Sequence, residues 1–122
     1  MLDSAVRRIN KEYNTMKIWV DDIRPAPEGY IWCKSVIDAK YMIETYSNYI
    51  GGFSTRAHDI IELIDLDHDA GEYAQYGGDY IEIFHWLEET GRNYPIRIHS
   101  MNPIGRGNMR RIIRKNGWTE ID

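Results

Sequence analysis

Aspartate residues cluster at two points where the sequence predicts that a buried strand ends. Asp21 and Asp22 follow the apolar run 16–20, and Asp67 follows the apolar run 60–66. Two carboxylates about 4 Å apart repel by roughly 4 kcal/mol at an effective dielectric constant of about 20, so a cluster of them favours a cation. Short oxygen ligands are those that Mg²⁺ and Mn²⁺ prefer. We therefore expect Asp21, Asp22 and Asp67 to bind a divalent metal ion, Mg²⁺ or Mn²⁺, unless they simply begin turns.

Two histidines lie beside these acids. His68 directly follows Asp67, and His99 ends the predicted strand 95–99. An imidazole titrates near neutrality, so either ring could act as a general acid or base. Either could also bind the metal ion, which would shift the preference toward Mn²⁺, Fe²⁺ or Zn²⁺. The alternative is that both rings are hydrogen-bonded structural groups.

A glycine-rich segment, residues 101–107, is predicted to form a loop before the last helix. Glycine lets backbone N–H groups approach a ligand, and a helix N-terminus attracts anions. The guanidinium group of Arg106 has the forked geometry that suits phosphate, and Arg24 could add a second fork. The alternatives are an ordinary turn and a surface ion pair of Arg24 with Asp21 or Glu28.

The elements that would position these groups alternate along the chain. The predicted strands are short apolar runs at residues 16–20, 30–34, 60–66, 95–99 and 118–121. The predicted helices have apolar residues at helical spacing and cover residues 1–14, 35–47 and 79–89, with a last helix from the 101–107 loop to about residue 116. This order predicts an α/β fold in three layers, with a mostly parallel sheet of four to five strands covered on both faces. Residues 1–15 form an N-terminal helical extension, and residues 16–122 form the α/β domain.

Size and composition fit one such domain. The chain has 122 residues, of which 43% are hydrophobic, so it can bury a core without cross-links. Cys33 is the one cysteine, which excludes an internal disulfide and suits a reducing compartment. The sequence contains neither a signal peptide nor a membrane-length apolar run, so we expect a cytoplasmic protein. The formal net charge of −4 argues against binding of double-stranded DNA.

Three segments together resemble the cyclic-phosphate-processing receiver-like domain family, which is related to response-regulator receiver domains. They are DDIRPAP at 21–27, LDHDAG at 66–71 and HSMNPIGRGNM at 99–109. The resemblance covers residues 16–118. It implies a receiver-like, flavodoxin-like sheet.

By this resemblance, Asp21 and Asp22 bind the metal ion, Asp67 is the receiver aspartate, and Ser100 contacts a phosphoryl group. His68 and the segment 99–103 mark the cyclic-phosphate branch of the family. The resemblance implies action on cyclic phosphates of RNA ends or of nucleotide-like products.

Two departures from receiver domains matter. The last predicted strand, 118–121, has no lysine, although signalling receivers end their fifth strand with one. The connection between the first two strands is also too short for a normal crossover helix. Either the first helix is lost and leaves an open crevice, or the strand 30–34 is misplaced. Ala70 is a smaller departure, because that branch has leucine there.

The favoured hypothesis is a metal-dependent phosphoesterase that opens a cyclic phosphate on an RNA end or small nucleotide. His68 or His99 would move a proton, and Asp67 could instead be a covalent nucleophile. The groups expected to hold phosphate oxygens are Arg24, Ser100, Asn102, Gly105, Arg106 and Gly107.

Two alternatives remain at this point. A binding module would capture a cyclic nucleotide without turnover, with its base stacked on Tyr73, Tyr76 and Tyr80. A degenerate receiver would regulate a partner through phosphorylation of Asp67. Residues 1–15 could provide an arm for a homodimer or cap the sheet.

Overall fold

The computed structural model describes residues 15–46 and 61–122. Within these ranges the elements, in chain order, are β1 (Met16–Val20), β2 (Tyr30–Cys33), α2 (Val36–Tyr46), β3 (Ile61–Leu66), the 3₁₀ helix η1 (Gly71–Gln75), α3 (Ile81–Thr90), β4 (Ile96–Ile98) and α4 (Pro103–Asn116). The predicted N-terminal helix lies outside the described residues, so the extension over 1–15 stays a prediction.

The strands form one parallel sheet in the order β2-β1-β3-β4. The predicted α/β fold with a parallel sheet is therefore confirmed. In place of a fifth strand, the described residues contain a single parallel bridge between Ile96 and Glu120. Val20 pairs with Leu66 of β3 and with Cys33 of β2, so these strands end at a common edge of the sheet.

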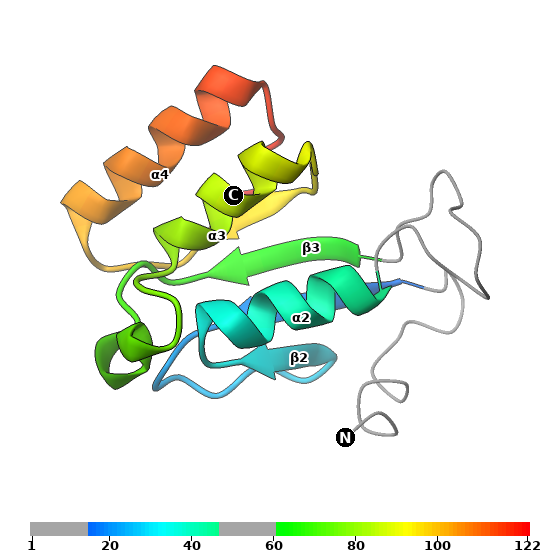
Figure 1. Cartoon of the computed structure of the whole chain (residues 1–122), viewed down its shortest axis with the longest axis vertical. Helices are drawn as coiled ribbons and strands as arrows, with labels where there is room; N and C mark the ends of the chain where they lie inside the picture. The colour runs from blue at the N-terminus through cyan, green and yellow to red at the C-terminus, as the bar shows by residue number, and fades with distance from the viewer. Residues whose placement is uncertain (1–14, 47–60) are drawn as a thin grey trace.

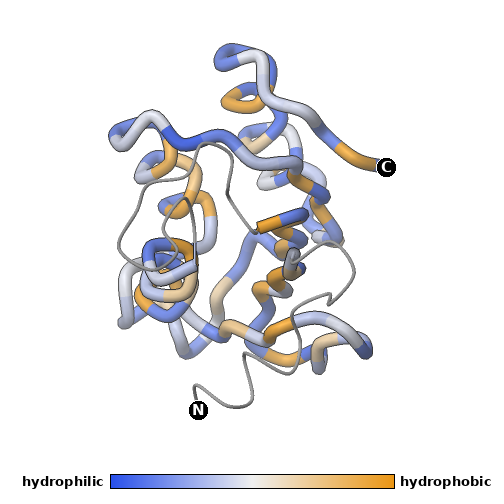
Figure 2. Tube along the Cα trace, turned by 90° about the vertical axis from the view of Figure 1, so that its right-hand side faces the viewer, coloured by the Kyte–Doolittle hydropathy of each residue, from blue (hydrophilic) through white to orange (hydrophobic). Residues whose placement is uncertain are grey.

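Helices α2 and α3 pack on the same face of the sheet (Figure 1). Both connections, β2 to β3 and β3 to β4, run in the same direction along the sheet, and right-handed crossovers then place both helices on one side. Helix α4 packs beside α3. Apolar side chains that alternate along the strands meet these helices, and Figure 2 shows the resulting orange segments in the interior. The largest fully buried side chains there include Tyr80, Phe84, Met16 and Ile18.

The connection from β1 to β2 contains no helix. It is the one connection between described strands that runs in the opposite direction, so only its helix would have covered the second face. The predicted strand at 30–34 is in place, and of the two explanations for the short connection, loss of the first helix is correct. The prediction of helices on both faces is wrong for the described residues, because α2, α3 and α4 leave the second face to side chains.

Two tryptophans hold this short connection against the sheet. Trp19 Nε1 donates to the carbonyl of Arg24 at 2.9 Å, and Trp32 Nε1 donates to the carbonyl of Asp21 at 2.7 Å. The N–H of Tyr30 then donates to the carbonyl of Pro27 at 3.1 Å, where the chain enters β2. Indole hydrogen bonds thus replace the packing that a crossover helix would give.

Cys33 closes β2 and lies in the core. Its thiol is buried, and burial raises the pKa of Cys33 to about 12. Its carbonyl accepts the N–H of Asp21 at 3.2 Å. The end of β2 is therefore tied directly to the first residue of the acidic cluster.

Tyr80 links the end of β2 to the start of α3. Removing its hydroxyl group tests how much this link stabilises the fold. The fully buried Tyr80 hydroxyl donates to the carbonyl of Lys34 at 2.8 Å. Tyr80→Phe should lower the free energy of unfolding by about 1 kcal/mol, because the carbonyl loses a buried partner. Denaturant titration measures this, with Tyr41→Phe on the exposed side of α2 as the control. Equal losses in both variants would contradict this role of the hydroxyl.

Candidate functional site

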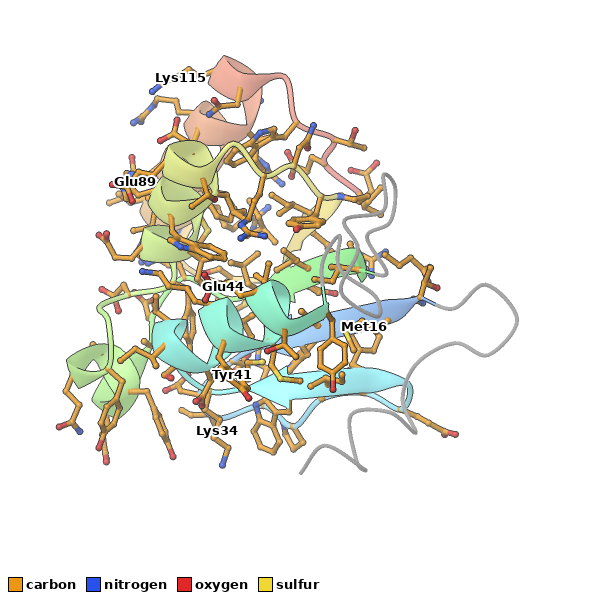
Figure 3. All side chains as sticks on the ribbon, turned by 45° about the vertical axis from the view of Figure 1, so that its right-hand side comes forward. Met16, Lys34, Tyr41, Glu44, Glu89 and Lys115 are labelled. Atoms are coloured by element: carbon orange, nitrogen blue, oxygen red, sulfur yellow. The ribbon has the colours of Figure 1, made fainter. Side chains whose placement is uncertain are left out.

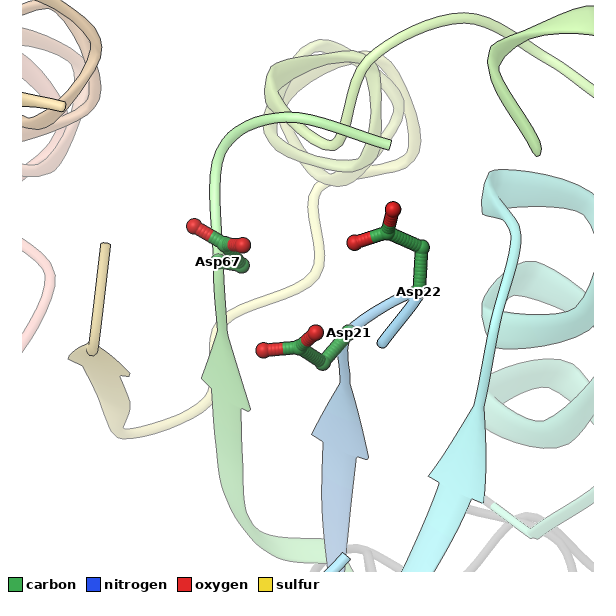
Figure 4. Close-up of side chains that lie close together, drawn as sticks. All are labelled: Asp21, Asp22 and Asp67. Carbon is green, nitrogen blue, oxygen red and sulfur yellow. The ribbon is translucent and has the colours of Figure 1, made fainter. Parts of the chain in front are cut away.

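Three carboxylates converge at the edge of the sheet where β1 and β3 end. One oxygen each of Asp21, Asp22 and Asp67 lies within 4.8 Å of the other two. Figure 4 shows these side chains turned toward a common space beyond the two strands. The convergence follows from register, because Val20 and Leu66 are paired and each is followed by an acid of the cluster. The predicted acidic cluster is therefore present.

Asp21 is the most firmly held of the three. The N–H groups of Ile23 and Arg24 both donate to its Oδ1 at 2.9 Å, and His99 Nε2 lies 2.8 Å from its Oδ2. Burial would raise the pKa of Asp21, but the hydrogen bonds from Arg24 and Ile23 and the His99 ring outweigh it and lower the pKa. Asp21 is thus a buried carboxylate with a fixed orientation.

Asp22 and Asp67 complete the cluster in a more open setting. Burial raises the pKa of Asp22, and the charges of Asp21 and Asp67 raise it further. Asp67 Oδ1 accepts the N–H of His68 at 2.8 Å. Gly71 has a left-handed φ of +56°, and a Cβ there would overlap the Asp22 carboxylate. Mutual repulsion among hard oxygen donors is relieved by a divalent cation, so the residues present fit Mg²⁺ or Mn²⁺.

His99 lies between two carboxylates. Its Nδ1 is 2.7 Å from Asp65 Oδ1, and its Nε2 contacts Asp21 as described above. The ring of Trp19 stacks on the imidazole with 3.9 Å between centroids and 6° between planes. Burial would lower the pKa of His99, but Asp65 and Asp21 outweigh it and raise the pKa.

The sequence prediction missed Asp65 and Trp19 as parts of this site. A signal existed for Asp65, since it is an acid inside an apolar run and alternates with Asp67 onto the same face of β3. Trp19 pairs with Asp65, and Asp65 pairs with Arg97, so the three form a row across the sheet. That row depends on the order of the strands, which the sequence alone did not determine.

His68 belongs to a second chain of contacts. Its Nδ1 lies 2.9 Å from Asp69 Oδ1, and Asn102 Nδ2 donates to Asp69 Oδ2 at 3.3 Å. The imidazole packs on the backbone of Gly105. The Asp69 carboxylate therefore holds Nδ1 of His68, and the Asn102 amide in turn holds that carboxylate.

The predicted loop at 101–107 is wrong from residue 103 onward, because α4 begins at Pro103. Asn102 caps the helix, with its Oδ1 accepting the N–H of Gly105 at 3.0 Å. The N–H of Arg106 donates to the carbonyl of Asn102 at 2.9 Å. These two N–H groups are thus used within the helix. They are not available for phosphate, contrary to the prediction. The capping asparagine and the proline after it were a sequence signal for this start.

The remaining predicted phosphate ligands lie in different settings. Ser100, the second residue after β4, is buried, and its Oγ accepts the N–H of Asn102 at 3.0 Å. Arg24 is exposed, and its Nη1 lies 3.5 Å from the carbonyl of His99. Arg106 and Gly107 lie half-buried in α4. The phosphate-binding role of these residues stays a prediction.

Tyr80 does not fit its predicted role in base stacking. Its side chain is fully buried between β2 and α3. Tyr73 and Tyr76 lie together on the η1 side of the site, with 6.1 Å between their ring centroids. Tyr76 is exposed, so only this pair stays a candidate for contact with a base.

Comparison with known proteins gives one match. A family model described as the cyclic-phosphate processing receiver domain matches residues 16–115. The match begins at β1 and extends into α4, so it includes all three carboxylates of the cluster. Searches of curated proteins and of solved structures found no match. Among the described residues, no helix combines the length and the apolar character that crossing a membrane requires.

The two glycines of α4 should respond oppositely to a methyl group. A Cβ at Gly105 would overlap the His68 ring, whereas a Cβ at Gly107 would have nothing within 4 Å. Gly107→Ala should stabilise the protein by up to about 1 kcal/mol through helix propensity. Gly105→Ala should destabilise it by about 1–3 kcal/mol through overpacking. Denaturant titration of both variants decides this, and stabilisation of both would contradict the packing of His68.

The raised pKa of His99 predicts a pH dependence of stability. Because the pKa of His99 is raised in the folded state, the protonated ring stabilises the fold. This stabilisation is complete at a pH below the ordinary histidine pKa of about 6.5 and is lost as the pH rises through the folded-state pKa. The lowered pKa of Asp21 contributes the same amount to the free energy of unfolding at every pH above the ordinary aspartate pKa, so it does not alter this dependence. Metal-free protein should therefore have a larger free energy of unfolding at about pH 6 than at about pH 9, and His99→Gln should reduce the difference. An unchanged difference in the variant would assign it to other groups.

Proposed function

Because this chain belongs to the family of cyclic-phosphate processing receiver domains, we propose that it is a metal-dependent phosphoesterase that opens a cyclic phosphate on an RNA end or small nucleotide. The observation that carries the proposal is the cluster of Asp21, Asp22 and Asp67, whose ligand oxygens lie within 4.8 Å of one another. These three residues would hold Mg²⁺ or Mn²⁺. The cation would supply neutralisation of phosphate charge and Lewis acidity at the phosphoryl oxygen.

His68 is the better candidate for the proton carrier. In ring opening, water loses a proton as its oxygen forms a bond to phosphorus, the bond from phosphorus to one ribose oxygen breaks, and that ribose oxygen takes up a proton. Asp69 holds His68 Nδ1 at 2.9 Å and so orients the ring, as a general acid or base requires. Both nitrogens of His99 are engaged by carboxylates, which argues against the same role for that ring. Asp67 as a covalent nucleophile remains an alternative route.

The phosphate would be held at the ends of β1 and β4. Ser100 is the second residue after β4, and Arg24 reaches the carbonyl of the neighbouring His99. A serine hydroxyl and a forked guanidinium group are both suited to phosphate oxygens. Arg106 lies in the first turns of α4 and could extend this set. Asn102 and Gly105 instead support the site, one by capping α4 and one by making room for His68.

Exposed apolar side chains near these residues favour a ligand with a planar apolar group. Ile23 follows Asp22, Met101 follows Ser100, and both are largely exposed. Ile104, in the first turn of α4, is exposed as well. Exposed apolar groups next to a charged site are typical of ligand contact, and a nucleobase offers such a surface.

A nucleotide-binding module is the second candidate, and one group of side chains favours it. Lys34 Nζ lies 4.5 Å from the ring centroid of Trp32 and 6.0 Å from that of Tyr73. Trp32 Nε1 donates to the carbonyl of Asp21, and Tyr73 lies two residues after Gly71, where a Cβ would overlap the Asp22 carboxylate, so both residues are close to the acidic cluster in the fold. Such rings could stack a base without any turnover. Metal-independent binding of an unchanged cyclic nucleotide would favour this function.

Asp67→Asn tests the phosphoesterase directly. Calorimetric titration with Mn²⁺ should show at least a roughly 10-fold loss of affinity, because a charged ligand is removed. Ring opening of 2′,3′-cyclic nucleotides, followed by phosphorus NMR, should require metal and be lost in the variant. The fold should persist, because Asp67 is half-buried and lies beyond the end of β3, outside the apolar core.

Glu44→Gln is the matched control, since it removes one negative charge from α2 (Figure 3). It should leave both metal affinity and ring opening unchanged. Full activity of Asp67→Asn, or loss of its fold, would contradict the proposed role of this residue.

A further inference from the structure

A line of buried side chains connects the acidic cluster to the middle of the sheet. Asp65 Oδ1 lies 2.7 Å from His99 Nδ1, and His99 Nε2 lies 2.8 Å from Asp21 Oδ2. The exposed fractions of these side chains are 3% for Asp65, 12% for His99 and 2% for Asp21. Charged groups buried this completely persist only when each has a partner, and here each has at least one.

Among the described residues, several contacts fix the imidazole of His99 in place. Trp19 stacks flat on the ring, and Trp19 Nε1 is itself anchored to the carbonyl of Arg24. The N–H of His99 donates to the carbonyl of Leu66 at 3.0 Å, which holds its backbone against β3. Asp65 has a further partner, Arg97, at 3.4 Å. The ring therefore has little freedom to turn toward a ligand.

This arrangement is poorly suited to proton transfer and well suited to orientation. A general acid or base must place a ring nitrogen within hydrogen-bond reach of the reacting group. Each nitrogen of His99 instead contacts a carboxylate. In metal sites, second partners of this kind fix the direction of a ligand and adjust its affinity for the ion. With Oδ1 held by two N–H groups and Oδ2 held by His99, Asp21 keeps one rotamer and still has one lone pair, on Oδ2, for a cation.

We propose that Asp65 and His99, with Trp19 stacked on the imidazole, position the carboxylate of Asp21 for metal binding. His99 is then a positioning residue and does not carry the proton. This inference rests on the metal site of the proposed function and adds Asp65, His99 and Trp19 to it. It extends the site inward, because Asp65 lies within β3, two residues before Asp67, and is outside the cluster of three carboxylates.

The experiment measures Mn²⁺ affinity in the full chain by calorimetry, with no substrate present. Asp65→Ala should weaken Mn²⁺ binding by about 10-fold to 100-fold, the range found for outer partners of metal ligands. Asp65→Asn keeps an oxygen that accepts from His99 Nδ1 and should recover most of the affinity. Arg97→Ala is the matched control, because it removes the other partner of Asp65 and leaves His99 in place. Its Mn²⁺ affinity should stay near wild type.

A second measurement separates positioning from proton transfer. Electron paramagnetic resonance of bound Mn²⁺ should change in Asp65→Ala and return toward wild type in Asp65→Asn. His99→Gln should bind Mn²⁺ more weakly yet regain ring opening at saturating Mn²⁺. Unchanged affinity in His99→Gln with turnover lost at saturating metal would overturn the proposal and make His99 the proton carrier.

The outcomes also separate this inference from the proposed function. Wild-type Mn²⁺ binding without ring opening, together with weaker binding in Asp65→Ala, would overturn the phosphoesterase and support the positioning role. Wild-type affinity in a folded Asp65→Ala variant, together with unchanged affinity in His99→Gln, would overturn only the positioning role. If Asp65→Ala does not fold, unchanged affinity in His99→Gln would overturn it alone. If the wild type binds neither Mn²⁺ nor Mg²⁺, both proposals fall.

Discussion

Parallel pairing of β1 with β3 is the constraint on which the acidic site depends. Because both strands run in the same direction and end in register, the first polar residue after each is delivered to the same edge. Side-chain alternation then places Asp21 and Asp67 on the face that also carries Trp19 and Asp65. A shift of either strand by one residue would turn its aspartate toward the helices, so apolar burial on one face specifies the site on the other.

The short connection from β1 to β2 determines what surrounds that site. With no crossover helix on the second face among the described residues, aromatic and charged side chains cover it themselves. Trp19 and Trp32 use their ring N–H groups on the connection and present their faces to His99 and Lys34. A helix in this place would have required apolar residues at positions such as Asp65 and Arg97. The family match and the missing helix are compatible, because the acidic edge needs only the order of the strands.

Sequence reasoning predicted the strands and the acidic edge because both leave local signals. An apolar run followed by aspartates marks a buried strand and its end, and the motifs around Asp21, Asp67 and His99 agree with the family that matches. The start of α4 was predicted incorrectly because the two glycines were given more weight than the asparagine cap. Asp65 was not predicted as a site residue because its role depends on cross-strand neighbours, and such neighbours follow from strand order and register rather than from spacing along the chain.

The tie between Cys33 and Asp21 has a consequence for chemical reactivity. The thiol is buried at the end of β2, an edge strand among those described, so an alkylating reagent reaches it only when that strand opens. The same opening breaks the hydrogen bond from the Asp21 N–H to the Cys33 carbonyl and so disturbs the acidic edge of the sheet. A cation that binds only the closed form lowers the population of the open form by the factor 1 + [L]/Kd. Cation binding would thus slow the alkylation of Cys33, and the rate of that reaction would report the occupancy of a site whose ligands contain no sulfur.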